Sequence, residues 1–214
     1  TVTATFTLNT HSLTVVKAGT GSGVVSSAPV GIDCGITCSS TFSHGTQVTL
    51  TPTPLPWSTF AGWSGACNGT GPCVVTMDAA KSVTAPYIDV AAPAVGLTSP
   101  TGGEVWDTGS AHAITWTATD NVGVDSVSIE SSIHGPSGPW TLLAHGLANS
   151  GSWSWTPTGG ASDSVHVRVR AIDRQGNIGG AINTSAFALR AGGISHETAL
   201  RELQVEGRGG EAGG

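Results

Sequence analysis

The fold of the first half of this chain is decided by one stretch, Phe60-Ala61-Gly62-Trp63-Ser64-Gly65-Ala66-Cys67-Asn68-Gly69-Thr70-Gly71-Pro72-Cys73. It joins an aromatic strand end to a glycine-rich turn and then to two closely spaced cysteines. Glycine permits tight turns, and this density of glycine with a proline disfavours a helix. The stretch therefore predicts a small β module, in which these residues have a structural role and not a catalytic one.

The composition extends this prediction to the whole chain. The 214 residues include 31 Gly, and only 10% of the residues are charged. The length suits one or two domains, and the composition is typical of short strands and tight turns. The net charge is -6 and the 8 Lys and Arg are scattered, so no basic patch can neutralise phosphates. We therefore expect an all-β protein that does not bind nucleic acid.

All four cysteines lie in the first half as near neighbours in sequence, Cys34 and Cys38, then Cys67 and Cys73. An even count in a charge-poor chain favours disulfides and an oxidising, extracellular compartment, without fixing which cysteines pair. Four thiolates could instead close a tetrahedral zinc shell, although no histidine adjoins them. No apolar run approaches membrane-spanning length, and no charged-then-apolar signal segment opens the chain. We expect no membrane insertion, and a chain that is mature or cut from a longer one.

The first residues of the chain recur 81 positions later, with Val2 aligned on Val83. The strings are Thr1-Val2-Thr3-Ala4-Thr5-Phe6 and Ser82-Val83-Thr84-Ala85-Pro86-Tyr87. In a strand, Val2, Ala4 and Phe6 share one face. Residues 1–7 are therefore either the closing strand of a preceding repeat or a donor strand that assembles with a neighbouring subunit through that face. The visible module covers residues 8–87.

Local patterns predict the elements of this module. Residues 13–16 and 24–27 flank a glycine-rich loop, which predicts a β-hairpin. Val48 and Leu50 alternate with threonines and predict a half-buried strand. Pro86 predicts that the last strand lies at a sheet edge, because proline cannot donate to a ladder.

Several strings between residues 12 and 87 carry a family resemblance. They are Val24-Val25, Gly31-Ile32-Asp33-Cys34-Gly35-Ile36-Thr37-Cys38, Gly45-Thr46-Gln47-Val48-Thr49-Leu50, Phe60-Ala61-Gly62-Trp63-Ser64-Gly65-Ala66-Cys67 and Val83-Thr84-Ala85. This set resembles the bacterial divergent internalin-type B-repeat family. The resemblance implies a secreted, compact β module that occurs in tandem arrays as a spacer or adhesive unit, with no family-wide catalytic residue.

A second pattern follows a linker at residues 88–93. Seven short strands are predicted at residues 94–97, 113–119, 124–130, 140–144, 152–156, 165–172 and 186–190. In the clearest of them, small apolar residues alternate with His166, Arg168 and Arg170. Seven such strands predict an immunoglobulin-like sandwich over residues 94–190, without the inter-sheet disulfide.

Specific strings support this second prediction. They are Thr98-Ser99-Pro100-Thr101-Gly102-Gly103-Glu104-Val105-Trp106, Ile114-Thr115-Trp116-Thr117-Ala118 and Ala171-Ile172-Asp173-Arg174-Gln175-Gly176-Asn177. They resemble bacterial Ig-like domains appended to secreted enzymes and adhesins, which implies spacing, adhesion or carbohydrate association. Residues 191–214 form a Gly-rich tail, in which residues 195–205 suit a short helix. We expect either a flexible linker there or a docking helix.

Oxygen-bearing side chains gather in the loops of the second domain. In an immunoglobulin-like topology the loop after residue 119 and the loop after residue 172 lie at the same pole, and the linker enters that pole. Such oxygen ligands predict a calcium site that stiffens the joint between the domains. The alternative is that these Asp and Asn side chains cap turns. The candidate ligands are Asp89, Asp120, Asn121, Asp125, Asp173 and Asn177.

The chain has 7 Trp, and exposed aromatic rings can stack on sugars. Trp57 lies among prolines and Trp140 follows Gly138-Pro139, so these two rings are the candidate carbohydrate contacts. The alternative for both is ordinary packing. We expect four other tryptophans to face the core: Trp63, Trp116, Trp153 and Trp155.

Catalysis finds little support in the sequence. Residues 62–66 lack the last glycine and the strand-to-helix context of a nucleophile elbow. We therefore expect a non-catalytic structural module of an extracellular or cell-surface protein, a stalk, spacer or adhesin segment. Its partners would be neighbouring repeats or subunits of the same protein, and polysaccharide or a host surface. Two alternatives stay open: a carbohydrate-binding accessory module of a secreted hydrolase, and a subunit of an extracellular filament assembled by strand donation.

Overall fold

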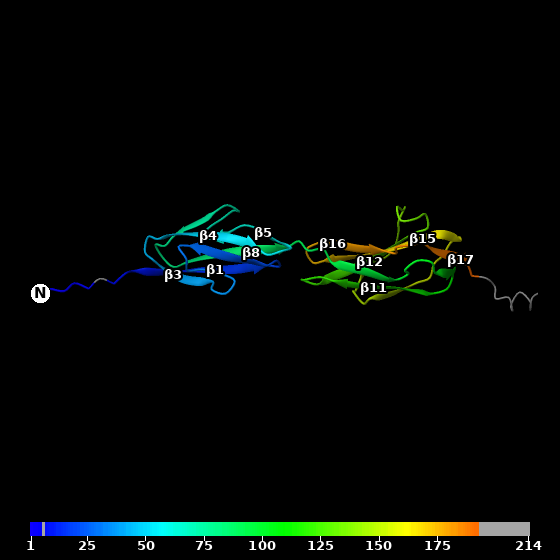
Figure 1. Ribbon diagram of the computed structural model, residues 1–214, viewed down its shortest axis with the longest axis horizontal. Helices are drawn as coiled ribbons and strands as arrows, with labels where there is room; N and C mark the ends of the chain where they lie inside the picture. The colour runs from blue at the N-terminus through cyan, green and yellow to red at the C-terminus, as the bar shows by residue number, and fades with distance from the viewer. Residues whose placement is uncertain (6, 193–214) are drawn as a thin grey trace, which may run out of the picture. The chain divides into compact units, whose positions relative to one another are not determined.

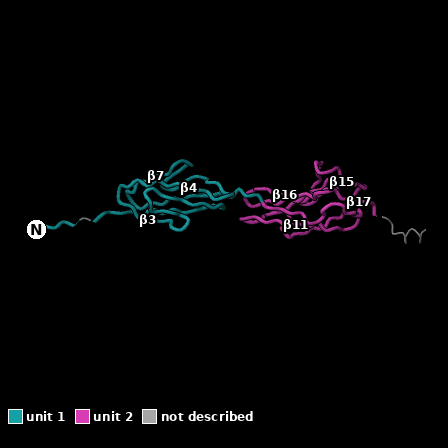
Figure 2. The backbone as a smooth tube through the Cα atoms, viewed as in Figure 1, with its two compact units in different colours: residues 1–92 teal, residues 93–214 magenta. Residues whose placement is uncertain are grey.

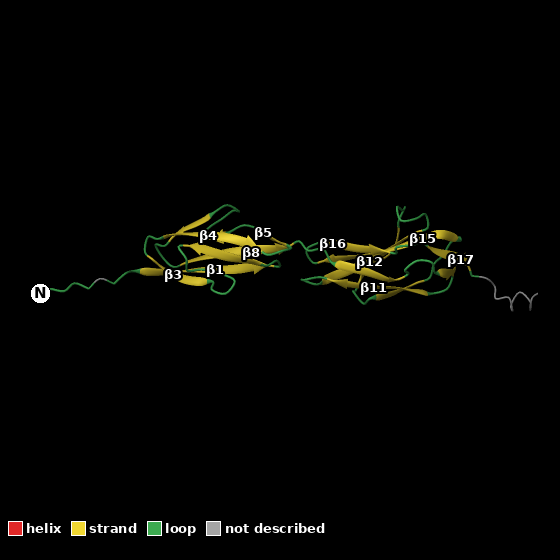
Figure 3. Ribbon diagram, in the orientation of Figure 1, coloured by secondary structure: helices red, strands yellow, loops and turns green. Residues whose placement is uncertain are grey.

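The computed structural model describes residues 1–5 and 7–192, and all regular elements within them are β-strands (Figure 3). The all-β prediction is therefore confirmed. The chain divides into two compact units, Thr1–Ala92 and Pro93–Gly214 (Figure 2). The predicted helix at residues 195–205 lies outside the described residues. No helix in the described part of the chain has the length and apolarity needed to cross a membrane.

Unit 1 consists of two sheets (Figure 1). The larger sheet has the order β3-β1-β8-β5, and β6 also pairs with β8. The smaller sheet has the order β2-β4-β7. The strands are β1 (Thr10–Gly19), β2 (Gly23–Ala28), β3 (Ser39–Ser43), β4 (Gln47–Pro54), β5 (Ser58–Phe60), β6 (Ser64–Gly65), β7 (Cys73–Thr76) and β8 (Lys81–Asp89).

The core of unit 1 forms because alternate residues of these strands point inward. Val48 and Leu50 of β4 are buried, as their alternation with threonines predicts. Tyr87 of β8 is 1% exposed and its hydroxyl donates a hydrogen bond to the carbonyl of Val24 at 2.8 Å. Trp63, in the glycine-rich stretch of residues 60–73, is buried and its indole donates to the carbonyl of Gly71 at 3.0 Å. The Trp63 side chain therefore links the aromatic strand end to the glycine-rich turn.

The predicted hairpin of residues 13–27 is wrong. β1 pairs with β3 and β8, whereas β2 pairs with β4 in the other sheet. The connecting loop carries the chain between sheets, and its glycines allow close packing. A Cβ on Gly23 would lie 2.1 Å from an atom of the Tyr87 ring. The glycines therefore serve a contact with a distant strand rather than a two-stranded turn.

The prediction that Pro86 marks an edge strand is also wrong, because β8 lies between β1 and β5. Proline is tolerated there because the antiparallel partners of β8 are interrupted. β6 pairs with Val83 and Thr84, and β5 pairs with the strand only from Tyr87 onward. Pro86 stands opposite the break, where its missing N–H removes no pair of the β5 or β6 ladder.

The four cysteines form two local disulfides, Cys34–Cys38 and Cys67–Cys73. The disulfide prediction is confirmed, and the zinc alternative is wrong because no thiolate is left to bind a metal. Cys34 and Cys73 are almost completely buried and belong to the core. Each bridge thus fastens an irregular segment to the packed interior.

Unit 2 is a sandwich of two sheets with immunoglobulin-like pairing. One sheet has the order β14-β11-β9, and the other has the order β10-β17-β15-β12-β13, with β16 also paired to β15. The strands are β9 (Ala94–Ser99), β10 (Val105–Thr108), β11 (His112–Thr119), β12 (Val124–Ser132), β13 (Thr141–Leu147), β14 (Ser152–Trp155), β15 (Ser162–Asp173), β16 (Ile178–Ile182) and β17 (Phe187–Ala191).

The clearest predicted strand is the centre of this core. Val165, Val167 and Val169 of β15 are 0% exposed, because the period of two places them all on the inner face. His166 departs from the pattern, since it is 6% exposed although it alternates with the valines. Two strands, β10 and β16, have no counterpart among the predicted seven, and Trp140 lies just before β13 rather than in it.

In each unit the strand that closes the fold runs parallel to a strand near its beginning. β1 and β8 of unit 1 pair in parallel from Leu13 opposite Lys81 to Gly19 opposite Tyr87. β10 and β17 of unit 2 pair in parallel from Val105 opposite Ala188 to Thr108 opposite Ala191. β8 extends to Asp89, so Ile88 and Asp89 belong to this strand and not to the predicted linker.

Candidate functional sites

Two aspartates cap turns of unit 2 with their own carboxylates. Oδ1 of Asp120 accepts hydrogen bonds from the amides of Val122 and Gly123, at 2.9 and 3.1 Å. Oδ1 of Asp173 accepts from the amides of Gln175 and Asn177, both at 2.8 Å. Both are Asx turns, which Asp forms where a strand ends. One oxygen of each carboxylate, Oδ1, therefore caps its turn, as the alternative to calcium binding predicts.

Asp173 is 2% exposed and is held ionised by its surroundings. Burial alone would raise its pKa, but hydrogen bonds from the Asn177 side chain and from the amides of the turn outweigh burial, so the pKa lies below its usual value. Its second oxygen, Oδ2, accepts from Nδ2 of Asn177 at 2.8 Å. The carboxylate is therefore a fixed negative charge inside the loop.

The two turns bring their carboxylates together. Ligating oxygens of Asp120 and Asp173 lie within 4.8 Å of each other. Oδ2 of Asp120 is buried and accepts no hydrogen bond, and the same is true of Oε1 of Gln175 in the second turn. Among the described residues, no Lys, Arg or His forms an ion pair with either aspartate. Two close carboxylates repel each other, and acceptors without donors favour a cation.

The other predicted ligands occupy different positions. Asn177 donates to Asp173, Asn121 is an exposed residue of the first turn, and Asp125 is exposed on β12. Asp89 ends β8 of unit 1, is 1% exposed, and accepts a hydrogen bond from the amide of Ala91 at 3.3 Å. Within unit 2 the structure thus joins Asp120 and Asp173 of the predicted set.

The two predicted carbohydrate contacts differ in their exposure. Trp57 is 71% exposed and has a φ of 64°, a backbone angle that is rare for a bulky residue. Trp140 is half-buried, and the Arg168 guanidinium carbon lies 4.4 Å from the centre of its ring. One face of Trp140 is therefore covered by a cation, and that face is not available for stacking on a sugar.

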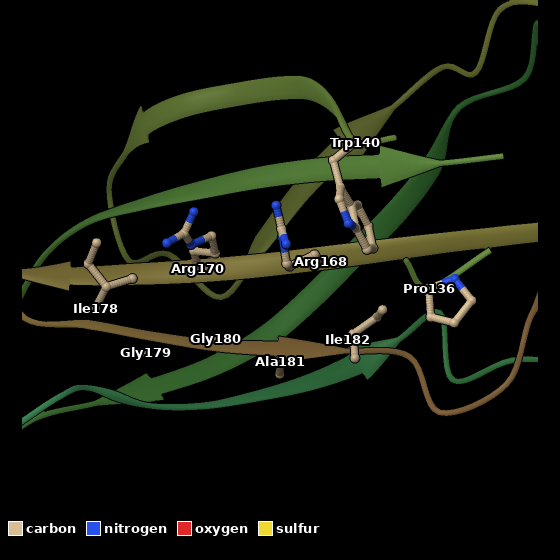
Figure 4. A pocket seen from close by; sticks show the side chains of 9 residues that line it. All are labelled: Pro136, Trp140, Arg168, Arg170, Ile178, Gly179, Gly180, Ala181 and Ile182. Atoms are coloured by element: carbon tan, nitrogen blue, oxygen red, sulfur yellow. The ribbon is translucent and has the colours of Figure 1, made fainter. Parts of the chain in front are cut away.

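Trp140 instead forms one end of a groove on the larger sheet of unit 2 (Figure 4). The groove has a volume of about 450 Å³. Figure 4 shows Arg168 and Arg170 side by side on β15, with β16 along one side of them and Pro136 near Trp140. The residues that define it are Trp140, Arg168, Arg170, Ile178, Gly180 and Ile182.

The two arginines of the groove have different surroundings. Nε of Arg168 lies 2.7 Å from Oε2 of Glu130 on β12, so its charge is paired. Arg170 has no ion pair or side-chain hydrogen bond to another described residue. It stands opposite Ser128 on β12 and Gly180 on β16, neither of which carries charge. The sequence predicts that both arginines leave the core, but it gives no signal for the groove, whose residues come from separate segments.

The predicted assembly residues lie at the beginning of the chain. Val2 is 99% exposed, Ala4 is also exposed, and neither belongs to a strand; Phe6 lies outside the described residues. Their counterparts in the repeated string, Val83 and Ala85, are 0% exposed in β8. The position that such a strand fills in unit 1 is thus occupied by the chain's own β8.

Comparison with known proteins supports the assignment of the modules. No curated protein was found to match the sequence. Two similar solved structures are the fibronectin(III)-like modules of Clostridium thermocellum CbhA and immunoglobulin domains 1-5 of Sidekick-1. The first is 12% identical with a TM-score of 0.41, and the match covers 86% of this chain and 94% of that chain. The second is 11% identical with a TM-score of 0.28, and the match covers 83% and 58%. Because both scores are low, the immunoglobulin-like assignment of unit 2 relies on its own strand pairing.

The family comparison concerns unit 1. The sequence profile described as "Divergent InlB B-repeat domain" matches residues 13–91. Together with the immunoglobulin-like unit, these modules are typical of non-catalytic extracellular proteins, and no catalytic domain is identified. The repeat and the two disulfides indicate a surface-type, extracellular protein. Residues 13–91 therefore match a divergent InlB B-repeat domain, which confirms the family predicted from the sequence for the first unit.

Proposed function

We propose that this chain is a load-bearing spacer of an extracellular surface protein. The observation that carries the proposal is the parallel pairing of an early strand with the closing strand in each unit. Because parallel strands point the same way, the chain enters a unit at one end of this ladder and leaves at the other. A force applied to the two chain ends then pulls the paired strands past each other.

This direction of loading makes a small module resistant to force. When strands slide along each other, all hydrogen bonds between them are loaded together, whereas strands that peel apart lose their bonds one after another. Forced unfolding depends on the rate of unfolding rather than on the equilibrium stability, so the loading direction decides the resistance. The ladder between β1 and β8 has seven residue pairs and that between β10 and β17 has four. We expect unit 2 to open at the lower force.

Single-molecule pulling with two attachment geometries tests the proposal. Handles at the two chain ends load β1 and β8 in shear. Moving the first handle to Thr20, just beyond the end of β1, brings both attachment points of unit 1 to one end of the ladder and peels it. We expect the unfolding force of unit 1 to fall severalfold while that of unit 2 stays the same. Equal forces for unit 1 in the two geometries would contradict a load-bearing role.

We further propose that calcium binds to the carboxylates of Asp120 and Asp173 and rigidifies that end of unit 2. The observation that favours it is the approach of two carboxylates beside buried oxygen acceptors that have no donor. Calcium takes several oxygen ligands in flexible geometry, and water can complete the shell. Binding of an ion to the folded state alone stabilises it by about 2.7 kcal/mol at a hundredfold excess over Kd.

Melting of the full chain in calcium and in a chelator tests this site. In Asp120→Asn, Oδ1 can still cap the turn, but the negative charge and the free acceptor are removed. We expect calcium to raise the Tm of unit 2 in the wild type and to leave the variant unchanged. Asp107→Asn, an exposed change on β10, is the matched control and should keep the calcium response. A wild-type Tm that does not respond to calcium would refute the site without affecting the spacer proposal.

A further inference from the structure

The groove beside Arg170 supports a role that is separate from both proposals above. Its volume of about 450 Å³ is typical of ligand sites in proteins. We propose that it binds an acidic polysaccharide, with a uronate carboxylate held by the Arg170 guanidinium. The proposal depends neither on the spacer role nor on calcium.

Charge is the first argument. The chain has a net charge of -6 and only 8 Lys and Arg, yet two arginines line this one groove. No Asp or Glu of the described residues lines it. Arg168 is fixed between Glu130 and the Trp140 ring, so it contributes a rigid wall. Arg170 remains to bind an anion, and a guanidinium binds a carboxylate through two parallel hydrogen bonds.

The apolar walls indicate that the anion belongs to a larger molecule. Ile178 is 46% exposed and Ile182 is 36% exposed, and both line the groove. Four residues of strand separate them by about 13 Å. A single small anion would leave these side chains in water, whereas sugar rings present C–H faces to them and carry carboxylates at intervals. An open groove of this length therefore suits a segment of acidic polysaccharide.

The backbone of β16 leaves the floor of the groove open. Gly180 stands opposite Arg170 and leaves the arginine stem uncovered, so the floor of the groove is open. The carbonyl of Pro93 approaches Gly179 so closely that a Cβ there would lie 1.7 Å from its oxygen. Gly179 stands opposite the buried Ala171, so this contact lies on the inner face of β16, away from the groove.

Calorimetric titration of the full chain with an oligogalacturonate, and with a neutral cello-oligosaccharide of equal length, tests the proposal. We expect the acidic oligomer alone to bind. Arg170→Gln should weaken binding about tenfold or more, the usual effect of losing a charge-assisted hydrogen bond. Arg190→Gln removes the same charge from β17, outside the groove, and should leave the affinity within twofold of the wild type.

A second variant separates the groove from its charge. Gly180→Val keeps both arginines, and its Cβ would lie 3.5 Å from Cγ of Arg170 and 3.3 Å from the Val169 carbonyl oxygen, so the side chain fills the floor. We expect it to weaken binding about as much as Arg170→Gln, with an unchanged circular dichroism spectrum. Absence of binding to the oligogalacturonate, equal binding of the neutral oligomer, or equal losses in Arg170→Gln and Arg190→Gln would each overturn the proposal. Competition by an equal concentration of inorganic sulfate would also overturn it, because the site would then select an anion rather than a sugar.

Discussion

The two disulfides predict how unit 1 lengthens when it is pulled open. An unfolded chain extends by about 3.5 Å for each residue released. From Thr10 to Asp89, unit 1 has 80 residues in its ordered part. The disulfides close loops with sequence separations of 4 and 6, so together they withhold ten residues from extension. The 70 residues that remain extend to about 245 Å, and the two bridges add about 10 Å. The nine residues of β8 give a folded length of about 30 Å. Unfolding should therefore lengthen the oxidised molecule by about 225 Å.

Reduction should change this length by an amount that each bridge fixes separately. The Cα atoms are 4.2 Å apart across Cys34–Cys38 and 5.6 Å apart across Cys67–Cys73. Replacing the first pair by alanine should therefore add about 10 Å, the second about 15 Å, and both about 25 Å. Unit 2 has no cysteine, and its 98 residues from Ala94 to Ala191 should give a step of about 310 Å in every case.

Optical tweezers with handles at the chain ends measure these steps, and the unit 2 step in the same trace is the internal control. The reasoning is refuted if the two alanine pairs fail to add to the effect of reduction, or if reduction lengthens the larger step. Either result would mean that the cysteines do not form these local loops in the folded molecule.

Three further predictions concern stability. Asp173 and Glu104 both have a pKa below the usual value, because hydrogen bonds outweigh the effect of burial. Their contribution to the stability of unit 2 is therefore fully present above the unfolded pKa values of 3.8 and 4.5. It is lost as the pH falls through the lower pKa values of the folded state. Unit 2 should therefore lose stability in this acidic range, and Asp173→Asn should flatten that part of a plot of unfolding free energy against pH. Gly23→Ala should destabilise unit 1 by about 2 kcal/mol in urea titrations, because the added Cβ overlaps the Tyr87 ring. Tyr87→Phe should cost about 1 kcal/mol, because it removes the hydrogen bond from the hydroxyl to the Val24 carbonyl. A larger loss in Tyr87→Phe than in Gly23→Ala would contradict this packing. Removal of residues 1–8 should change the urea midpoint little, since the described residues among them are exposed and lie in no strand, and a large loss would show that this segment packs on unit 1.

The sequence was most informative where structure depends on local spacing. The alternation in β15 predicts which face is buried, because a period of two is a property of one strand. The pairing of β1 and β2 could not be obtained in this way, since it depends on contacts of Gly23 with Tyr87, far along the chain. β16 was not predicted from the sequence, because Gly179 and Gly180 interrupt the alternation of apolar and polar residues that marks a strand.

The candidate sites show the same limit. The turns at Asp120 and Asp173 could be placed at one pole because the immunoglobulin-like order of strands fixes where loops meet. Arg170 could be assigned to the outer face of its strand, but not to a groove. That groove exists because Gly180 on β16 is opposite Arg170 and because Trp140, before β13, packs on the adjacent arginine. These are relations between three segments, and no spacing along the chain encodes them.

The two units fasten their irregular segments by different chemistry. Unit 1 uses two covalent bridges, whose strength depends on the redox state of the surroundings. Unit 2 uses carboxylates that accept backbone amides, as Glu104 does from Thr101 and Gly102 at 2.6 and 2.7 Å and as Asp120 and Asp173 do in their turns. The bonds to Glu104 and Asp173 are charge-assisted and hold the pKa of each carboxyl below its usual value, so they weaken in acid. An oxidising medium near neutral pH satisfies both units at once, and those conditions are found outside a cell. The separate dependences also mean that reductant should weaken unit 1 while unit 2, which has no cysteine, stays folded.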